Sequence, residues 1–164
     1  MTPTSAILPP GGERGLTPGE AALVRSVFGD AVDPAPVRIR RSRWFPLQPR
    51  ETVMAPCGHI HFHPQSSRYR DDFAAEGPAL RGLFVHEMVH VWQAQQRGKW
   101  WLPLMRHPFC RYDYVLREGW PLSLYGIEQQ AEIVRHCHLA VTGTPESGAP
   151  PLELLRRIVP FTNA

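Results

Sequence analysis

Five consecutive residues of this 164-residue chain, His86-Glu87-Met88-Val89-His90, form the pattern H-E-x-x-H. Side chains four positions apart on an α-helix project from the same face, so the imidazoles of His86 and His90 can bind one metal ion. Glu87 lies one step round the helix, beside the metal rather than bound to it. A carboxylate in that position suits the activation of a water molecule in a zinc hydrolase. The motif therefore predicts a catalytic zinc site.

The residues around the motif predict the helix that it requires. Pro78 suits the first position of a helix, and Gly98 suits its end. Apolar residues recur between them with helical spacing, so we expect the segment to pack into a core. They are Leu80, Leu83, Phe84, Val85, Met88, Val89 and Trp92. The alternative is that His86 and His90 have a purely structural role.

A catalytic zinc needs a third protein ligand and one open position for water. The metzincin pattern requires glycine and histidine where this chain has Gln93 and Gln96, so that subclass is excluded. The other common arrangement takes a glutamate from a later helix. The segment Tyr125–Val134 offers Glu128 and Glu132, four residues apart on one helical face.

Two alternatives to Glu128 as the third ligand stay open. Spaced acids on a helix usually form a solvated face, and Glu118, in the loop-like sequence R-E-G-W-P, is a competing ligand. We favour Glu128 because the upstream motif needs a third ligand and no better one is found. The small side chain of Ala131 would let the two helices approach each other closely.

At these residues the chain resembles the gluzincin branch of the zincin metallopeptidases, in which the third ligand is a glutamate of a downstream helix. The resemblance implies that Glu128 is this ligand. It also implies that Glu132 occupies the place of an acid or amide that holds one ligand histidine by its other ring nitrogen. That place usually carries Asp or Asn, so the longer Glu132 departs from the pattern.

Further strings carry a wider resemblance, which covers most of the chain from Leu16 onward. They are L-T-P-G-E at 16–20, V-F-G-D at 27–30, V-R-I at 37–39, M-A-P at 54–56, G-H-I at 58–60, Phe62, H-E-M-V-H-V-W-Q at 86–93 and E-Q-Q-A-E at 128–132. Together they resemble small bacterial proteins named Vgr-related or Rhs-associated. These proteins are similar to H-E-x-x-H metallopeptidase domains found beside contractile secretion systems and polymorphic toxins. The resemblance implies the fold, the metal site and a Vgr- or Rhs-type secretion component as partner, and it leaves the substrate open.

Length and composition predict one domain. The chain is 43% hydrophobic, enough for a single core over residues 16–164, after a flexible Pro/Gly-rich tail over 1–15. The net charge is only +3, and Arg38–Arg43 is the one dense basic run. Its alternation predicts a strand with solvated arginines rather than a surface for nucleic acid.

The order of elements predicts an α+β fold with a minimal zincin core. Thr17 caps a first helix in which Pro18 comes first, Glu20 completes a capping box and Gly29 ends the helix. A small three-stranded sheet, the metal helix, an irregular aromatic-rich stretch over 100–121, the Glu128 helix and a short last helix follow. We expect the strands at Val37–Arg41, Glu51–Ala55 and Gly58–His63, and the last helix at Leu152–Ile158.

Histidines alternate with apolar residues in the third expected strand. His59, His61 and His63 would share one face and Ile60 and Phe62 the other, which predicts an exposed histidine face over an apolar underside. The zincin resemblance implies a second interpretation, in which an edge strand lines the cleft and pairs with extended substrate. His59 or His61 would then contact the substrate or stabilise the oxyanion.

An electrophilic side chain should assist the metal in stabilising a tetrahedral intermediate. Tyr125 is one candidate because it precedes Glu128 by three positions and would share its helical face if the helix has begun there. Tyr112, Tyr114 and Arg111 are the others, and dense aromatic residues are more often part of a core.

The remaining features concern the compartment. The three cysteines, Cys57, Cys110 and Cys137, are an odd number without a C-x-x-C pair, which favours a reducing compartment without disulfides. Cys137 stands between two histidines, but adjacent helical residues diverge too far to bind one ion. We expect a cytoplasmic chain without a membrane partner. Export that does not use a conventional signal peptide is left open.

The sequence thus favours a zinc-dependent hydrolase, most readily a peptidase, whose substrate is a peptide or protein. Glu87 would accept a proton from water and deliver it to the leaving amine. A non-catalytic zinc-containing adaptor of a type VI-like or Rhs/Vgr system is the alternative from another class. A toxin effector with a target in another cell and a protease of a DNA-bound protein are two further hypotheses.

Overall fold

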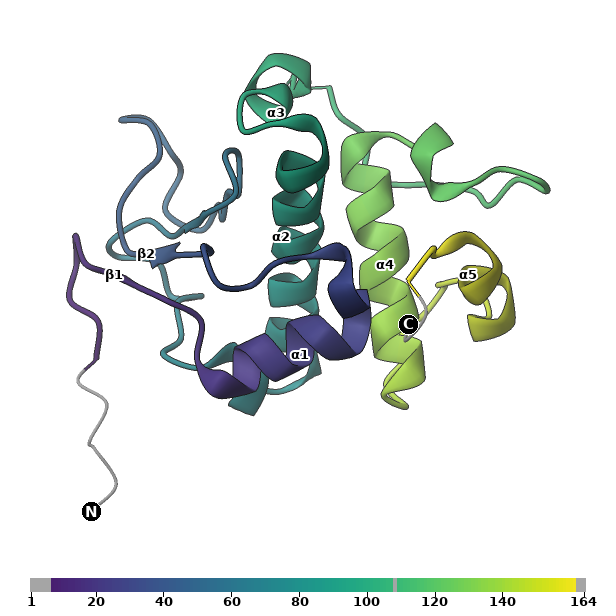
Figure 1. The fold of residues 1–164 in the computed structure, drawn as a ribbon, viewed down its shortest axis with the longest axis horizontal. Coiled ribbons are helices and arrows are strands. Elements are labelled where there is room, and N and C mark those ends of the chain that lie inside the picture. The colour runs from purple at the N-terminus through teal and green to yellow at the C-terminus, as the bar shows by residue number, and fades with distance from the viewer. Residues whose placement is uncertain (1–6, 108, 162–164) are drawn as a thin grey trace.

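The computed structural model describes residues 7–107 and 109–161 (Figure 1). Within these ranges the chain forms five α-helices and one three-stranded sheet, which confirms the predicted α+β class. Helices α2 and α4 lie side by side through the centre, α1 crosses near the start of α2, and α5 packs on α4. The helices are α1 (Pro18–Phe28), α2 (Pro78–Arg97), α3 (Trp101–Met105), α4 (Ile127–Val141) and α5 (Leu152–Ile158).

Helix α1 begins and ends where the sequence predicts. The Thr17 hydroxyl accepts a hydrogen bond from the backbone N–H of Glu20 at 3.0 Å, and the Glu20 carboxylate accepts one from the N–H of Thr17 at 2.9 Å. This capping box satisfies two backbone donors at the helix start. The helix ends at Gly29, which has a φ of 56° that other residues rarely adopt.

The buried carboxylate of Glu20 also joins three parts of the fold. It pairs with the guanidinium of Arg14 at 2.7 and 2.9 Å and accepts the backbone N–H of Phe73 at 2.9 Å. Arg14 belongs to strand β1 (Glu13–Arg14), which lies within the tail predicted over residues 1–15. Part of the predicted tail thus belongs to the sheet, and residues 1–6 lie outside the described ranges.

The sheet is smaller than predicted. Strand β2 (Ile39–Arg40) pairs antiparallel with β1 and parallel with β3 (Ile60–His61), with Ile39 opposite Ile60. The strand expected at Glu51–Ala55 is wrong, because only Met54 forms an isolated bridge, opposite His61. The backbone before it closes turns, such as Thr52 N–H to the Pro49 carbonyl, and so cannot extend the sheet.

The basic run Arg38–Arg43 was expected to present solvated arginines. Three of its four arginines instead form ion pairs or hydrogen bonds within the protein. Arg40 pairs with Glu13 at 2.9 Å. The other two donate to backbone carbonyls: Arg38 to Ala35 and Val37, and Arg41 to Leu8 and Pro64. These contacts give three arginines of the run a structural role.

The expected exposed histidine face is wrong. Ile60 and Phe62 are buried as predicted, but His61 and His63 on the other side are buried too, and His59 is half-buried. The Nδ1 atom of His61 lies 3.3 Å from the Ser42 carbonyl, so a loop covers this side. Burial lowers the pKa of His61 to about 4, so the ring is neutral at neutral pH.

Helix α2 runs from Pro78 to Arg97 and ends at Gly98, as predicted. Its Gly82 faces α4, where a Cβ atom would lie 3.4 Å from Cγ of Arg135 and 3.5 Å from Leu139, so the two helices approach closely. Helix α5 also matches its predicted range. Helix α3, in contrast, lies in the stretch expected to be irregular. Pro103 is compatible with it because the first turn of a helix needs no backbone donors there.

The Glu20 cluster predicts the effect of one substitution. Replacing Glu20 with Gln removes the charge that compensates Arg14, so we expect the free energy of unfolding to fall by about 3 kcal/mol. Urea denaturation followed by circular dichroism measures this change. Glu153→Gln, at an exposed position of α5, is the control and should change stability by less than about 0.5 kcal/mol. Equal stability of the two variants would contradict the central role of Glu20.

Candidate metal centre

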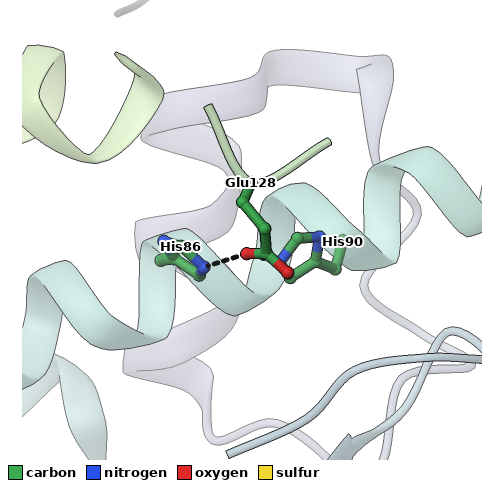
Figure 2. Close-up of side chains that lie close together, drawn as sticks. All are labelled: His86, His90 and Glu128. Carbon is green, nitrogen blue, oxygen red and sulfur yellow. Dashed lines mark hydrogen bonds and ion pairs between the residues drawn. The ribbon is translucent and has the colours of Figure 1, made fainter. Parts of the chain in front are cut away.

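The structure brings together the three residues that were predicted as metal ligands. Nε2 of His86 and Nε2 of His90, both from α2, lie 3.2 and 3.0 Å from one carboxylate oxygen, Oε2 of Glu128 in α4. The three candidate ligand atoms lie within 4.8 Å of one another, and all three side chains are buried. Figure 2 shows the Glu128 carboxylate directed between the two imidazoles.

The other ring nitrogen of each histidine is held by a fixed acceptor. Nδ1 of His86 lies 2.7 Å from Oε1 of Glu132, and Nδ1 of His90 lies 2.9 Å from Oε1 of Gln93. Each Nδ1 atom therefore carries a proton, because a carboxylate and an amide oxygen only accept hydrogen bonds. Each ring is then oriented with Nε2 toward Glu128, the arrangement of a histidine that binds metal through Nε2.

The pKa values indicate a site that holds positive charge. Burial by itself lowers the pKa of His86, but hydrogen bonds to Glu128 and Glu132 outweigh it and raise that pKa to about 9. Burial raises the pKa of both carboxyl groups. Hydrogen bonds from His86 and His90 nevertheless hold the pKa of Glu128 far below its usual value, and those from His86 and Arg135 hold the pKa of Glu132 at about 2. Both carboxylates are therefore ionised at neutral pH and favour a cation beside them.

The donor set fits a zinc ion. Two imidazole nitrogens and one carboxylate oxygen are a common ligand set of catalytic zinc. Two buried oxygens of the described residues, Oε2 of Glu87 and Oε1 of Glu128, accept no hydrogen bond from protein, and Arg106 approaches the latter to 3.2 Å only as an ion pair. A buried carboxylate oxygen with neither kind of partner among the described residues, as Oε2 of Glu87 is, is costly unless a cation or water lies beside it.

Comparison with known proteins decides the family. No model of a known protein family matches the sequence. The chain is 39% identical over 143 residues to the type VI secretion system spike protein VgrG2b of Pseudomonas aeruginosa. A solved structure, the effector domain of that VgrG2b, is similar with a TM-score of 0.68 and 38% identity, over 79% of this chain and 75% of that domain. The chain belongs to the VgrG2b effector-domain family.

This membership confirms the predicted resemblance to Vgr-related proteins. The aligned region covers 83% of this chain but only 14% of the VgrG2b spike protein. The similarity therefore concerns the effector domain and not the rest of the spike protein.

In this VgrG2b-type domain, Glu132 is held on the side away from His86. Arg135, one turn later on α4, donates to both oxygens of Glu132 at 2.9 to 3.2 Å and pairs with Glu146 at 2.6 Å. The longer side chain that departs from the gluzincin pattern thus reaches His86 and is fixed by a bidentate partner. The sequence analysis did not single out Arg135, although its spacing of three from Glu132 is a usable signal.

Gln93 is a second supporting residue that the sequence analysis missed. Besides meeting His90, its side-chain amide donates to the Ile127 carbonyl at 3.1 Å and to the Gln130 side chain at 2.9 Å. Gln130 in turn donates to the carbonyl of Tyr125 at 2.7 Å. Gln93 therefore links α2 to the start of α4. The sequence analysis considered this residue only as a departure from the metzincin pattern.

A cavity of about 460 Å³ opens beside the metal-binding group. His86, Glu87, Tyr112 and Arg106 contribute to its wall. The ring of Tyr112 stacks on that of His86, with 6.1 Å between ring centroids. The other lining residues are Glu51, Thr52, Val53, Arg68, Ala79, Leu83, Glu132 and Arg135.

Other predicted contacts lie elsewhere. Tyr125 precedes α4 instead of belonging to it, and its hydroxyl accepts the backbone N–H of Arg117 at 2.9 Å. Tyr114 is hydrogen-bonded to His136 at 2.6 Å, and the exposed Arg111 pairs with Asp113. His59, His61 and Tyr125 are not among the described residues that line the cavity, and their contact with substrate stays a prediction.

The Gln93 contacts predict a difference between two glutamines of α2. Gln93→Ala leaves His90 and the start of α4 without buried hydrogen-bond partners, so the free energy of unfolding should fall by about 1 to 3 kcal/mol. Gln96→Ala, at an exposed position of the same helix, should change it by less than about 0.5 kcal/mol. Chemical denaturation of both variants measures the difference. Similar values for the two would show that Gln93 does not brace the helices.

Proposed function

We propose that this chain is an effector domain that works with a VgrG-type spike of a type VI secretion system and hydrolyses peptide bonds with the help of zinc. The observation that carries the hydrolase proposal is the convergence of His86, His90 and Glu128, with Glu87 beside them in the cavity wall. Membership of the VgrG2b effector-domain family supports the secretion proposal more directly than it supports the chemistry.

His86, His90 and Glu128 would hold the ion. A bound zinc ion lowers the pKa of water to about 7 and polarises a carbonyl group. The contribution of this chain is to fix both imidazoles through Glu132 and Gln93 and to keep Glu128 ionised. The buried setting excludes most bulk water from the three ligands and so strengthens their interaction with a cation.

Glu87 would transfer the proton. It precedes Met88 on the buried side of α2, lines the cavity, and its Oε2 atom has no partner among the described residues. This oxygen is therefore available to accept a proton from water and to deliver it to the leaving amine. A carboxylate already engaged in an ion pair would have to break that contact first.

Arg106 and Tyr112 are the side chains best placed to stabilise negative charge on the substrate carbonyl. Both line the cavity beside His86 and Glu87, and each carries N–H or O–H donors. Their positions favour them over Tyr125, Tyr114 and Arg111, which are not among the described residues that line this cavity. The substrate is a peptide or protein that enters this open cavity.

The alternative is a zinc-containing adaptor that acts in secretion without turnover. The family membership is compatible with it, because the relative's description as an effector domain of a spike protein names no reaction. The environment of Glu87 favours the hydrolase. A structural metal site needs no buried carboxylate without a partner beside its ligands, and such a group lowers stability.

The ligand set predicts the metal content of two variants. Glu128→Ala removes a ligand, so it should retain less than about a tenth of the zinc found in the wild type. Glu118→Ala changes the competing glutamate, which is exposed in the loop before Trp120, and should retain a stoichiometric amount. Elemental analysis of purified protein measures zinc, and circular dichroism checks folding. Stoichiometric zinc in folded Glu128→Ala would exclude this ligand set.

The proposed role of Glu87 predicts a separation of zinc binding from catalysis. Glu87→Gln keeps the size of the side chain but cannot accept the proton, so hydrolysis should fall at least about a hundredfold while zinc content is unchanged. Mass spectrometry of peptides released from a bacterial proteome compares it with the wild type. Cleavage products made only by the wild type support the hydrolase. Equal activity of the variant would exclude the mechanism, and inactivity of both proteins with full zinc would favour the adaptor.

A further inference from the structure

Four large apolar side chains are exposed together at one end of the molecule. Trp100, Leu104, Met105 and Phe109 expose 61, 82, 53 and 84% of their surface. The first three lie in or directly before α3, and Phe109, four residues after it, lines one cavity with Met105 and Arg97. Figure 1 shows α3 as a short projection beyond the end of α2. These four residues, with Arg97 and Lys99 at the base of α3, are called the α3 tip below.

The charges of the α3 tip have one sign. The sequence has no Asp or Glu between Met88 and Tyr112, and Arg97 and Lys99 are both exposed. Each cation lies over a tryptophan ring, with Arg97 5.4 Å from Trp101 and Lys99 5.7 Å from Trp100. A projecting apolar group bordered by cations therefore faces the solvent.

This combination suits the surface of an anionic bilayer. Tryptophan is enriched at membrane–water interfaces, and basic residues beside exposed Leu and Phe attract acidic headgroups while the apolar side chains enter the boundary with the acyl chains. A protein partner would need a hollow that matches these four side chains. A bilayer needs none, because its surface adapts to a projection.

We propose that the α3 tip is a membrane-docking surface that binds lipid bilayers containing anionic phospholipids. The expectation from the sequence was that the chain has no membrane partner, and it rested on the lack of a spanning segment. No helix of the described residues is long and apolar enough to span a bilayer. The proposed contact instead lies on the membrane surface.

Docking would also orient the metal centre. Arg106 follows α3 directly and Tyr112 lies six residues later, and both line the cavity beside His86. A bilayer bound to the α3 tip would thus lie near this part of the chain. The docking proposal does not depend on the hydrolase, because it concerns side chains outside the metal-binding group.

Co-sedimentation with vesicles tests the proposal. The full chain should bind vesicles of phosphatidylcholine mixed with phosphatidylglycerol and bind pure phosphatidylcholine more weakly. Leu104→Ser should lower the partition coefficient about tenfold on the mixed vesicles, because it removes apolar area that enters the bilayer. Lys99→Glu should lower it about tenfold on the mixed vesicles and leave binding to pure phosphatidylcholine nearly unchanged.

Two control variants distinguish docking through the α3 tip from nonspecific hydrophobic binding and from catalysis. Leu47 is 83% exposed in the loop that follows β2, so Leu47→Ser removes an equally exposed leucine elsewhere and should bind like the wild type. Glu87→Gln should also bind like the wild type, whatever its effect on hydrolysis. The proposal is overturned if the wild type does not sediment with phosphatidylglycerol vesicles, or if Leu104→Ser binds them as well as Leu47→Ser does. The second outcome would make another protein the better partner for this surface.

Discussion

The burial of one carboxylate between two helices is the constraint on which the rest of the structure depends. Glu128 is 1% exposed and remains ionised, so positive or proton-donating groups must surround it. His86 and His90 provide them from α2, and Arg106 provides a guanidinium from the end of α3. The close packing of α2 on α4 brings these groups within reach. A cation held by His86, His90 and Glu128 would add to the same compensation.

Local signals in the sequence were sufficient for the ends of α1 and α2, but not for α3, which lies in a stretch expected to be irregular. Thr17 and Glu20 determine the start of α1, and Pro78 and Gly98 limit α2, because capping and proline geometry depend on a few neighbouring residues. Two features that were predicted wrongly depend on tertiary contacts. The face of His61 is buried because a distant loop covers it, and the segment before Met54 uses its backbone in turns rather than in the sheet.

In the candidate site, too, local spacing predicted some residues, while others depend on contacts between distant segments. The spacing of His86, His90 and Glu128 was sufficient to select residues that converge, because helical periodicity and a family resemblance both constrain them. Gln93 and Arg106 were not found, since their roles arise only when α4 and α3 fold back onto α2. Gln93 illustrates the difficulty well. In the sequence, Gln93 only excludes the metzincin pattern. In the structure, its side chain connects α2 to α4.

Gly82 is connected to the metal-binding group through two side chains, Arg135 and Glu132. The aliphatic part of Arg135 lies 3.4 Å from where a Cβ atom of residue 82 would be, and the guanidinium of the same arginine holds Glu132 against His86. A side chain longer than a methyl group at position 82 would displace that arginine, and the disturbance would pass through two side chains to an imidazole. Position 82 therefore influences how firmly His86 is held, although Gly82 has no side chain that could contact the imidazole.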